Sequence, residues 1–262
     1  MVINWDYVKI KTLWNYEDLL KKLCHTLNYR FVQEHYNHTM DEATDYIHQL
    51  HSIDLKKPEK QEWFEGLLLN FAWLRRVGIQ NYLDLLHQVD SKESCEDFLR
   101  VSGMGFPELI ETLNYLFRWV LPFPAPLREF FDAENATEMA YLQALKSRKI
   151  STTLDLLEAG RTPDLRTELA NASAIPSEFL LRLIHLADLA RLPFVRGKTV
   201  RHLYLAGYDT LEKLSAAEVQ QMEIALNDYF QLHGKSYADY KSVIPLQPLI
   251  HGARCLPRVI EM

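Results

Sequence analysis

The stretch that decides the fold runs from Leu74 to Phe123 and reads LRRVGIQNYLDLLHQVDSKESCEDFLRVSGMGFPELIETLNYLFRWVLPF. It recurs without a gap from Leu145 to Phe194. Eleven of the 50 aligned positions are identical, and in the first copy these are Leu74, Ile79, Leu83, Asp84, Leu85, Leu86, Ser102, Leu109, Leu121, Pro122 and Phe123. A repeated unit buries its apolar face against a neighbouring unit. The duplication therefore predicts tandem units of one architecture.

Both copies have the spacing of α-helices, because apolar residues recur every three or four positions. Each copy predicts a helix, a tight turn, a short helix containing Leu-Asp-Leu-Leu, and a longer helix; the turn is Gly78-Ile79 in the first copy and Lys149-Ile150 in the second. The start of the pattern returns a third time at Leu203, Gly207, Tyr208, Leu211 and Leu214. No segment has the pattern of a strand. The sequence predicts an all-α protein built from tandem helical hairpins.

Prolines and charged residues divide the chain into four parts. A charged connector at residues 52–60 separates an N-terminal helical region, residues 1–60, from the first hairpin copy, residues 61–131. Three prolines between Pro122 and Pro126 cannot continue a helix, and they precede a second copy that together with the partial third spans residues 132–230. Residues 231–262 contain further prolines and predict an irregular C-terminal tail.

Composition limits the class of protein. Hydrophobic residues make up 48% of the 262 residues, which is enough for a real core. No apolar run approaches the roughly 20 residues of a membrane span, and nothing near the N-terminus resembles a signal peptide. The three cysteines are far apart and lack CxxC spacing, which favours a reducing compartment without disulfides. We therefore expect a cytoplasmic protein with no membrane partner and no cofactor.

Charge is distributed unevenly. The net charge of −6 argues against a protein that binds nucleic acid over its whole surface. Residues 74–144 contain 6 basic and 11 acidic residues, whereas residues 145–203 contain 10 basic and 6 acidic ones. An anionic partner would therefore meet the second copy.

Four short motifs follow one another between Ile150 and Leu214: ISTTLDLL, RTELA, ADLARL and GYDTLEKL. In these motifs the segment resembles a helix-hairpin-helix-like domain family of unknown function, whose tandem hairpins are similar to those of DNA-repair proteins. The resemblance covers Ile150 to Leu214 directly. It implies an all-α scaffold of tandem helix-hairpin-helix-like (SAM-like) units. It also implies nucleic-acid binding, with DNA favoured over RNA.

The turn at residues 192–199, LPFVRGKT, carries the case for that binding. In DNA-binding hairpins, a Gly-apolar-Gly turn lets amides at a helix N-terminus approach a phosphate, and a following lysine adds charge. Lys198 and Thr199 stand at the matching places, although Phe194 and Arg196 replace the two glycines and Gly197 comes one residue late. The predicted nucleic-acid-binding residues are Arg191, Arg196, Gly197, Lys198, Thr199 and Arg201.

The first copy has the better glycine pattern, Gly103-Met104-Gly105, but acidic residues surround it. These acids, Glu96, Asp97, Glu108 and Glu111, would repel phosphate. We therefore expect the turn to be structural.

Two other functions remain open besides a non-catalytic nucleic-acid-binding module. The acidic first copy fits a protein-protein interaction scaffold. A metal-binding protein or enzyme is the third hypothesis, because histidines three residues apart share a helix face near carboxylates; the residues are His35, His38, His48 and His51, with Asp41, Glu42 and Asp45 between them. No local grouping of nucleophile and base predicts an enzyme.

Overall fold

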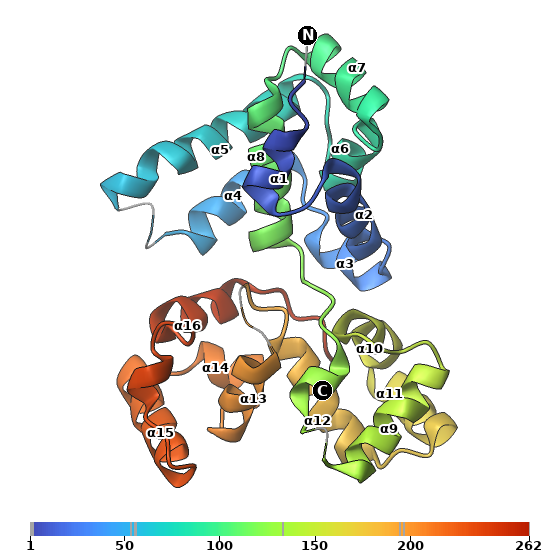
Figure 1. The fold of residues 1–262 in the computed structure, drawn as a ribbon, viewed down its shortest axis with the longest axis vertical. Coiled ribbons are helices and arrows are strands. Elements are labelled where there is room, and N and C mark those ends of the chain that lie inside the picture. The colour runs from blue at the N-terminus through green and yellow to red at the C-terminus, as the bar shows by residue number, and fades with distance from the viewer. Residues whose placement is uncertain are drawn as a thin grey trace. The chain divides into compact units, whose positions relative to one another are not determined.

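The computed structural model describes residues 3–52, 54, 57–132, 134–193, 195 and 197–261. It confirms the all-α class, since every element in these ranges is helical and their β contacts are two isolated bridges. The chain divides into two compact units, Met1–Leu121 and Pro122–Met262 (Figure 1). The boundary falls where Leu121 turns extended before Pro122, as a residue that precedes proline prefers.

The first unit contains the N-terminal helical region and the first repeat copy. Its elements are α1 (Asp6–Thr12), α2 (Tyr16–Leu27), α3 (Arg30–Tyr36), α4 (Met40–Leu50), α5 (Pro58–Arg76), α6 (Tyr82–Gln88), α7 (Lys92–Ser102), α8 (Phe106–Tyr115) and the π-helical turn η2 (Leu116–Val120). Large aromatic side chains fill its core, and Tyr16, Phe64, Phe71, Tyr82 and Tyr115 are at most 1% exposed. The Tyr16 hydroxyl donates to the Val89 carbonyl at 2.7 Å, so α2 is fixed to the end of α6.

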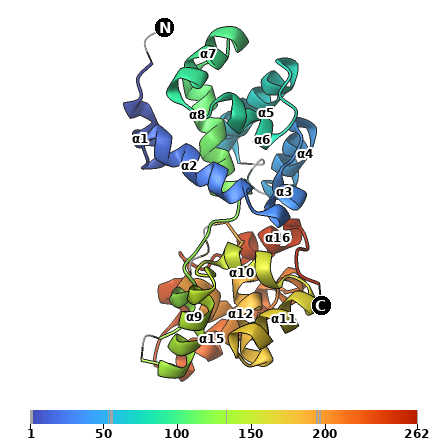
Figure 2. The same ribbon diagram turned by 90° about the vertical axis from the view of Figure 1, so that its right-hand side faces the viewer.

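The second unit contains the second copy, the partial third copy and the C-terminal segment. Its elements are the 3₁₀ turn η3 (Leu127–Phe130), α9 (Ala136–Ser147), α10 (Thr153–Gly160), α11 (Pro163–Ser173), α12 (Ser177–Leu189), α13 (Gly197–Leu205), α14 (Leu211–Ser215), α15 (Val219–Leu232), the 3₁₀ turn η4 (Tyr237–Tyr240) and α16 (Leu246–Cys255). Helices α10, α11 and α12 pack against one another (Figure 2).

The segment predicted as an irregular tail, residues 231–262, is not irregular throughout, because it contains α16. Pro248 lies in the first turn of this helix, where its missing N–H removes no intrahelical hydrogen bond. This proline therefore lies at the start of a helix and does not interrupt one. Helix α16 packs against α14.

The sequence repeat is also a structural repeat. Helices α6, α7 and α8 begin at Tyr82, Lys92 and Phe106, and α10, α11 and α12 begin at the aligned positions Thr153, Pro163 and Ser177. The short helices are capped by Asn81 and Thr152, which accept from the N–H groups of Asp84 and Asp155 at 3.0 and 3.2 Å. Each aspartate carboxylate in turn accepts from a backbone N–H of the preceding turn. These bonds explain why the aspartate of Leu-Asp-Leu-Leu is kept in both copies.

The turn before each short helix has the same backbone geometry in all three repeats. The N–H groups of Ile79, Ile150 and Tyr208 donate to carbonyls five residues earlier at 3.0, 3.1 and 3.0 Å. The preceding residues, Gly78, Lys149 and Gly207, have positive φ angles of 95°, 66° and 96°. This geometry ends a helix in the left-handed region and favours glycine. The second copy uses a lysine there instead.

Candidate functional site

Arg191, the first predicted phosphate contact, lies in the core of the second unit. The residue is 3% exposed, and its Nε donates to the Asp188 carboxylate at 2.7 Å. Its Nη1 donates to the Pro257 carbonyl at 3.0 Å, which attaches the C-terminal segment to α12. The prediction that Arg191 binds nucleic acid is therefore corrected, because its guanidinium is buried and bonded within the protein.

Gly197 and Thr199 are also buried, where α13 meets η3. A Cβ at Gly197 would lie 2.5 Å from the Glu129 Cβ and 3.0 Å from the Glu129 carbonyl oxygen. This glycine therefore allows two backbone segments to approach closely. Thr199 is 9% exposed on the same helix. Both residues serve the packing of α13.

Lys198 and Arg201 lie on the outer side of α13. The Lys198 side chain is exposed, whereas Arg201 makes a bidentate ion pair with Asp132, with both N–O distances at 2.5 Å. Hydrogen bonding and the positive charge of Arg201 hold the pKa of the Asp132 carboxyl below its ordinary value. The remaining predicted residue, Arg196, lies outside the described residues.

Basic side chains from two parts of the unit act electrostatically on His202. We name Lys198, Arg201, His202, His233 and Lys235 the α13 cationic cluster; the first three are on α13 and the last two follow α15, which packs against it (Figure 1). Burial lowers the pKa of His202, and the positive charges of Lys235, Arg201, His233 and Lys198 lower it further. His233 and Lys235 are exposed.

The sequence prediction missed His233 and Lys235. They lie far from Lys198 along the chain, in a segment of mildly acidic composition, so no local pattern connects them with α13. Aromatic packing brings them together: the His202 ring contacts Tyr229, Phe230 and Tyr240, and its Nδ1 lies 3.1 Å from the Tyr229 hydroxyl.

At the Gly103-Met104-Gly105 turn, a carboxylate of the protein itself lies beside the backbone. Gly103 adopts φ 70° and ends α7, and Gly105 precedes α8. The Glu108 carboxylate lies against Gly105, where its oxygen would be 2.0 Å from an added Cβ. A phosphate at this helix N-terminus would meet that carboxylate. The geometry agrees with the structural role expected from the sequence.

The N-terminal histidines are not brought together as a metal site. His38 packs between Tyr46 and Tyr82, and burial lowers its pKa. His51 is buried among Phe64, Trp119 and other rings, whereas His48 is exposed. Among the residues that the structure describes, no group of three or more His, Cys, Asp or Glu could hold a metal ion. The structure therefore gives the metal hypothesis no ligand set.

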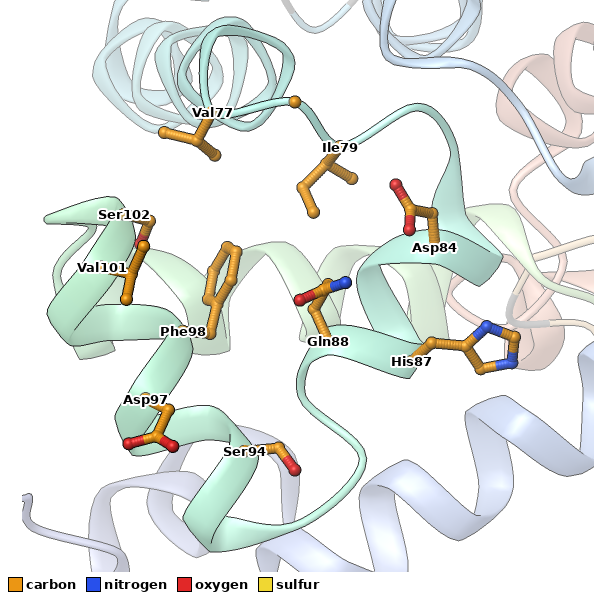
Figure 3. A pocket seen from close by; sticks show the side chains of 11 residues that line it. Val77, Ile79, Asp84, His87, Gln88, Ser94, Asp97, Phe98, Val101 and Ser102 are labelled. Carbon is orange, nitrogen blue, oxygen red and sulfur yellow. The ribbon is translucent and has the colours of Figure 1, made fainter.

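A groove of about 710 Å³ lies in the first copy, between the α5–α6 turn and α7 (Figure 3). Val77, Ile79, Phe98 and Val101 form its apolar walls, and Phe98 points across it toward Ile79. Val101 is 84% exposed, so its side chain adds accessible apolar surface to one wall. Polar residues complete the lining, among them two carboxylates. No sequence prediction assigns a binding role to the residues that line this groove.

A smaller cavity of about 230 Å³ lies over the Asp188–Arg191 pair in the second unit. The C-terminal segment forms part of its wall, and hydrogen bonds attach it to the rest of the unit. Arg191 donates to Pro257, Arg166 Nη2 donates to the Glu261 carbonyl at 2.9 Å, and the Glu261 N–H donates to the Arg161 carbonyl at 2.9 Å. Its charged groups are therefore used largely to hold the chain together.

Comparison with known proteins finds a match for one part of the chain. Residues 136–237 match the model of a family described as a domain of unknown function (DUF4332). The match runs from the first residue of α9 into η4 and includes α13. It covers less than half of the chain, and its description names no activity. No curated protein and no solved structure matches the chain. None of the described helices is long and apolar enough to cross a membrane.

Proposed function

We propose that this protein is a non-catalytic binding module that contacts nucleic-acid phosphates through the α13 cationic cluster. The observation that carries the proposal is that α13, with Lys198 and Arg201, packs against α15, which His233 and Lys235 follow, and that the charges of all four side chains act on His202. Phosphate contacts by such side chains supply affinity that is independent of sequence and sensitive to salt. The proposed contact set keeps Lys198 and Arg201 and adds His233 and Lys235; Arg191, Gly197 and Thr199 support the fold beneath them.

Arg201 would exchange partners when a phosphate arrives. Its ion pair with Asp132 is on the surface, because the Asp132 side chain is 66% exposed and that of Arg201 is 36% exposed. Surface ion pairs contribute only about 0–1 kcal/mol, so a phosphate competes with this carboxylate at little cost. Asp132 also repels an incoming phosphate. Asp132→Asn should therefore tighten binding several-fold.

The test is fluorescence anisotropy of the full chain with labelled duplex DNA, single-stranded DNA and RNA at several salt concentrations. Combined Lys198→Glu and Lys235→Glu should weaken binding and reduce the slope of log affinity against log salt by about 2. The duplex probe should bind more tightly than RNA if DNA is the preferred ligand.

Lys213→Glu with Lys241→Glu is the matched control, because it makes the same charge change in the same unit. Those lysines are paired with Asp209 at 2.7 Å and Glu223 at 2.6 Å, and neither belongs to the cluster. If both double variants weakened nucleic-acid binding equally, the effect would come from the net charge of the protein and not from the cluster. Absence of binding to all three probes at low salt would overturn the proposal.

A further inference from the structure

The two repeat copies differ at the groove of the first unit, and the difference shows what kind of group fits there. Arg148, which directly follows α9, donates through Nη2 to the carbonyl of Ala172 near the end of α11. In the alignment of the two copies, Arg148 corresponds to Val77 and Ala172 corresponds to Val101. In the second copy an arginine thus spans the two walls. In the first copy the same span is the open groove (Figure 3).

The groove is acidic as well as open. Its lining contains Asp84 and Asp97 and no lysine or arginine. Asp97 pairs with Arg100 on the same helix, but these side chains are 60% and 75% exposed, and such pairs contribute little. The Asp97 carboxylate is one helical turn before Val101 and so faces the same side of α7. A cation entering the groove would therefore meet both a carboxylate and the carbonyl end of a helix, which carries partial negative charge.

The apolar walls add a second requirement. Phe98 is half-buried and Val101 is 84% exposed, whereas Leu169, at the place of Phe98 in the second copy, is 8% exposed. Among the described residues, no side chain or backbone N–H donates to the Val101 carbonyl. At the position of Phe98 and at the helix-end carbonyl, the first copy therefore presents groups that the second copy covers with its own residues, whereas Ala172, at the place of Val101, is itself exposed.

We propose that this groove binds a protein segment that presents an arginine beside an apolar side chain. The guanidinium takes the place that Arg148 has in the second copy, donates to the Val101 carbonyl and pairs with Asp97. The apolar side chain covers Phe98 and Val101. This interaction goes beyond the proposed binding of nucleic acid, because it uses the other unit and the opposite charge.

The test uses ¹⁵N-labelled full-length protein and two synthetic peptides, acetyl-Ala-Leu-Arg-Ala-Leu-Ala-amide and the same peptide with glutamine in place of arginine. The arginine peptide should shift the amide resonances of the α5–α6 turn and the end of α7. The glutamine peptide should bind at least about tenfold more weakly, as expected when a charge-assisted hydrogen bond is lost.

Val77→Arg is the decisive variant, because it gives the first copy the residue that the second copy uses to span the walls. It should abolish the peptide-induced shifts, whereas Val243→Arg adds the same charge at an exposed valine of the second unit and should leave them unchanged. Asp97→Asn, at an exposed position, should weaken binding several-fold and covers the case in which Val77→Arg does not fold. Equal affinity for the two peptides, or unchanged binding by Asp97→Asn, would overturn the proposal.

Discussion

Arg191 and Asp188 form a buried ion pair at the end of α12, with side chains that are 1% and 10% exposed. The aligned residues of the first copy are Val120 and Phe117. One copy thus has apolar side chains at the place where the other has paired charges. The comparison explains why a basic residue near the candidate hairpin is part of the core.

Removing one partner of this pair should destabilise the second unit strongly. Arg191→Ala leaves the Asp188 carboxylate buried without its cation, and the expected loss is about 3–5 kcal/mol of unfolding free energy. The double variant Asp188→Leu with Arg191→Val, which follows the apolar pattern of the first copy, should recover much of that loss. Urea unfolding followed by far-UV circular dichroism measures both. An unchanged midpoint for Arg191→Ala would contradict this account.

Left-handed residues at equivalent turns give a pair of substitutions with opposite effects. Ala174 has φ 51° and ends α11, and Gly103 has φ 70° at the same place after α7. Ala174→Gly should stabilise by roughly 0.5–1 kcal/mol because alanine is strained there, and Gly103→Ala should destabilise by a similar amount. All five tryptophans lie in the first unit, so tryptophan fluorescence reports the second change and circular dichroism the first. Two changes of the same sign would show that backbone strain is not the cause.

Gly197 and Gly66 should respond oppositely to alanine. A Cβ at Gly197 would meet the Glu129 backbone at 3.0 Å, so Gly197→Ala should destabilise by about 1–3 kcal/mol. Gly66 lies within α5 and has nothing within 4 Å of its added Cβ, so Gly66→Ala should stabilise by about 0.5–1 kcal/mol. Thermal unfolding compares them. Full stability of Gly197→Ala would mean that η3 moves freely away from α13.

The pKa of His202 reports the α13 cationic cluster directly. Its pKa is lowered by burial and by the neighbouring positive charges, so an NMR titration should place it below the ordinary value of 6.5. Replacing Lys198 and Lys235 by alanine should raise the pKa toward its ordinary value, whereas Lys213→Ala should not change it. If the pKa of His202 did not change when both lysines were replaced, the prediction that their charges act on His202 would be wrong.

The same shift makes stability depend on pH. Because the pKa of His202 is lowered from 6.5 in the folded state, the unfolded chain binds a proton more readily. This contribution to stability is fully present above pH 6.5 and is lost as the pH falls from there through the lowered pKa. His202→Phe should flatten that part of the stability profile, measured by urea unfolding at a series of pH values on both sides of the ordinary histidine pKa. An unaltered slope would assign the pH dependence to other groups.

Local signals made the helical part of the fold predictable. The Leu-Asp-Leu-Leu motif includes the aspartate whose N–H donates to the capping residue of each short helix, Asn81 or Thr152. The turn before each short helix has the same backbone hydrogen bond in three repeats. Such features depend on residues a few positions apart, so a single sequence displays them. The prediction of an irregular tail overlooked α16, because a proline such as Pro248 indicates a break and a first helical turn equally well.

Which basic side chains are exposed to a binding partner could not be predicted from local sequence in the same way. Arg201 is paired with a residue 69 positions away, and Arg191 donates to one 66 positions away. Lys198 and Lys235 act on the same histidine, His202, because α13 packs against α15. These relationships depend on long-range packing, which composition and periodicity do not report.

The sequence by itself therefore determined the all-α class and the repeated helices, because capping, turn geometry and apolar periodicity act over short distances. Only the tertiary structure decided which arginines are buried, which cations gather at α13, and that Val77 leaves open the span that Arg148 crosses in the other copy. The physical reason is that a side chain's exposure and partners are set by the elements that pack around it, and these come from distant parts of the chain.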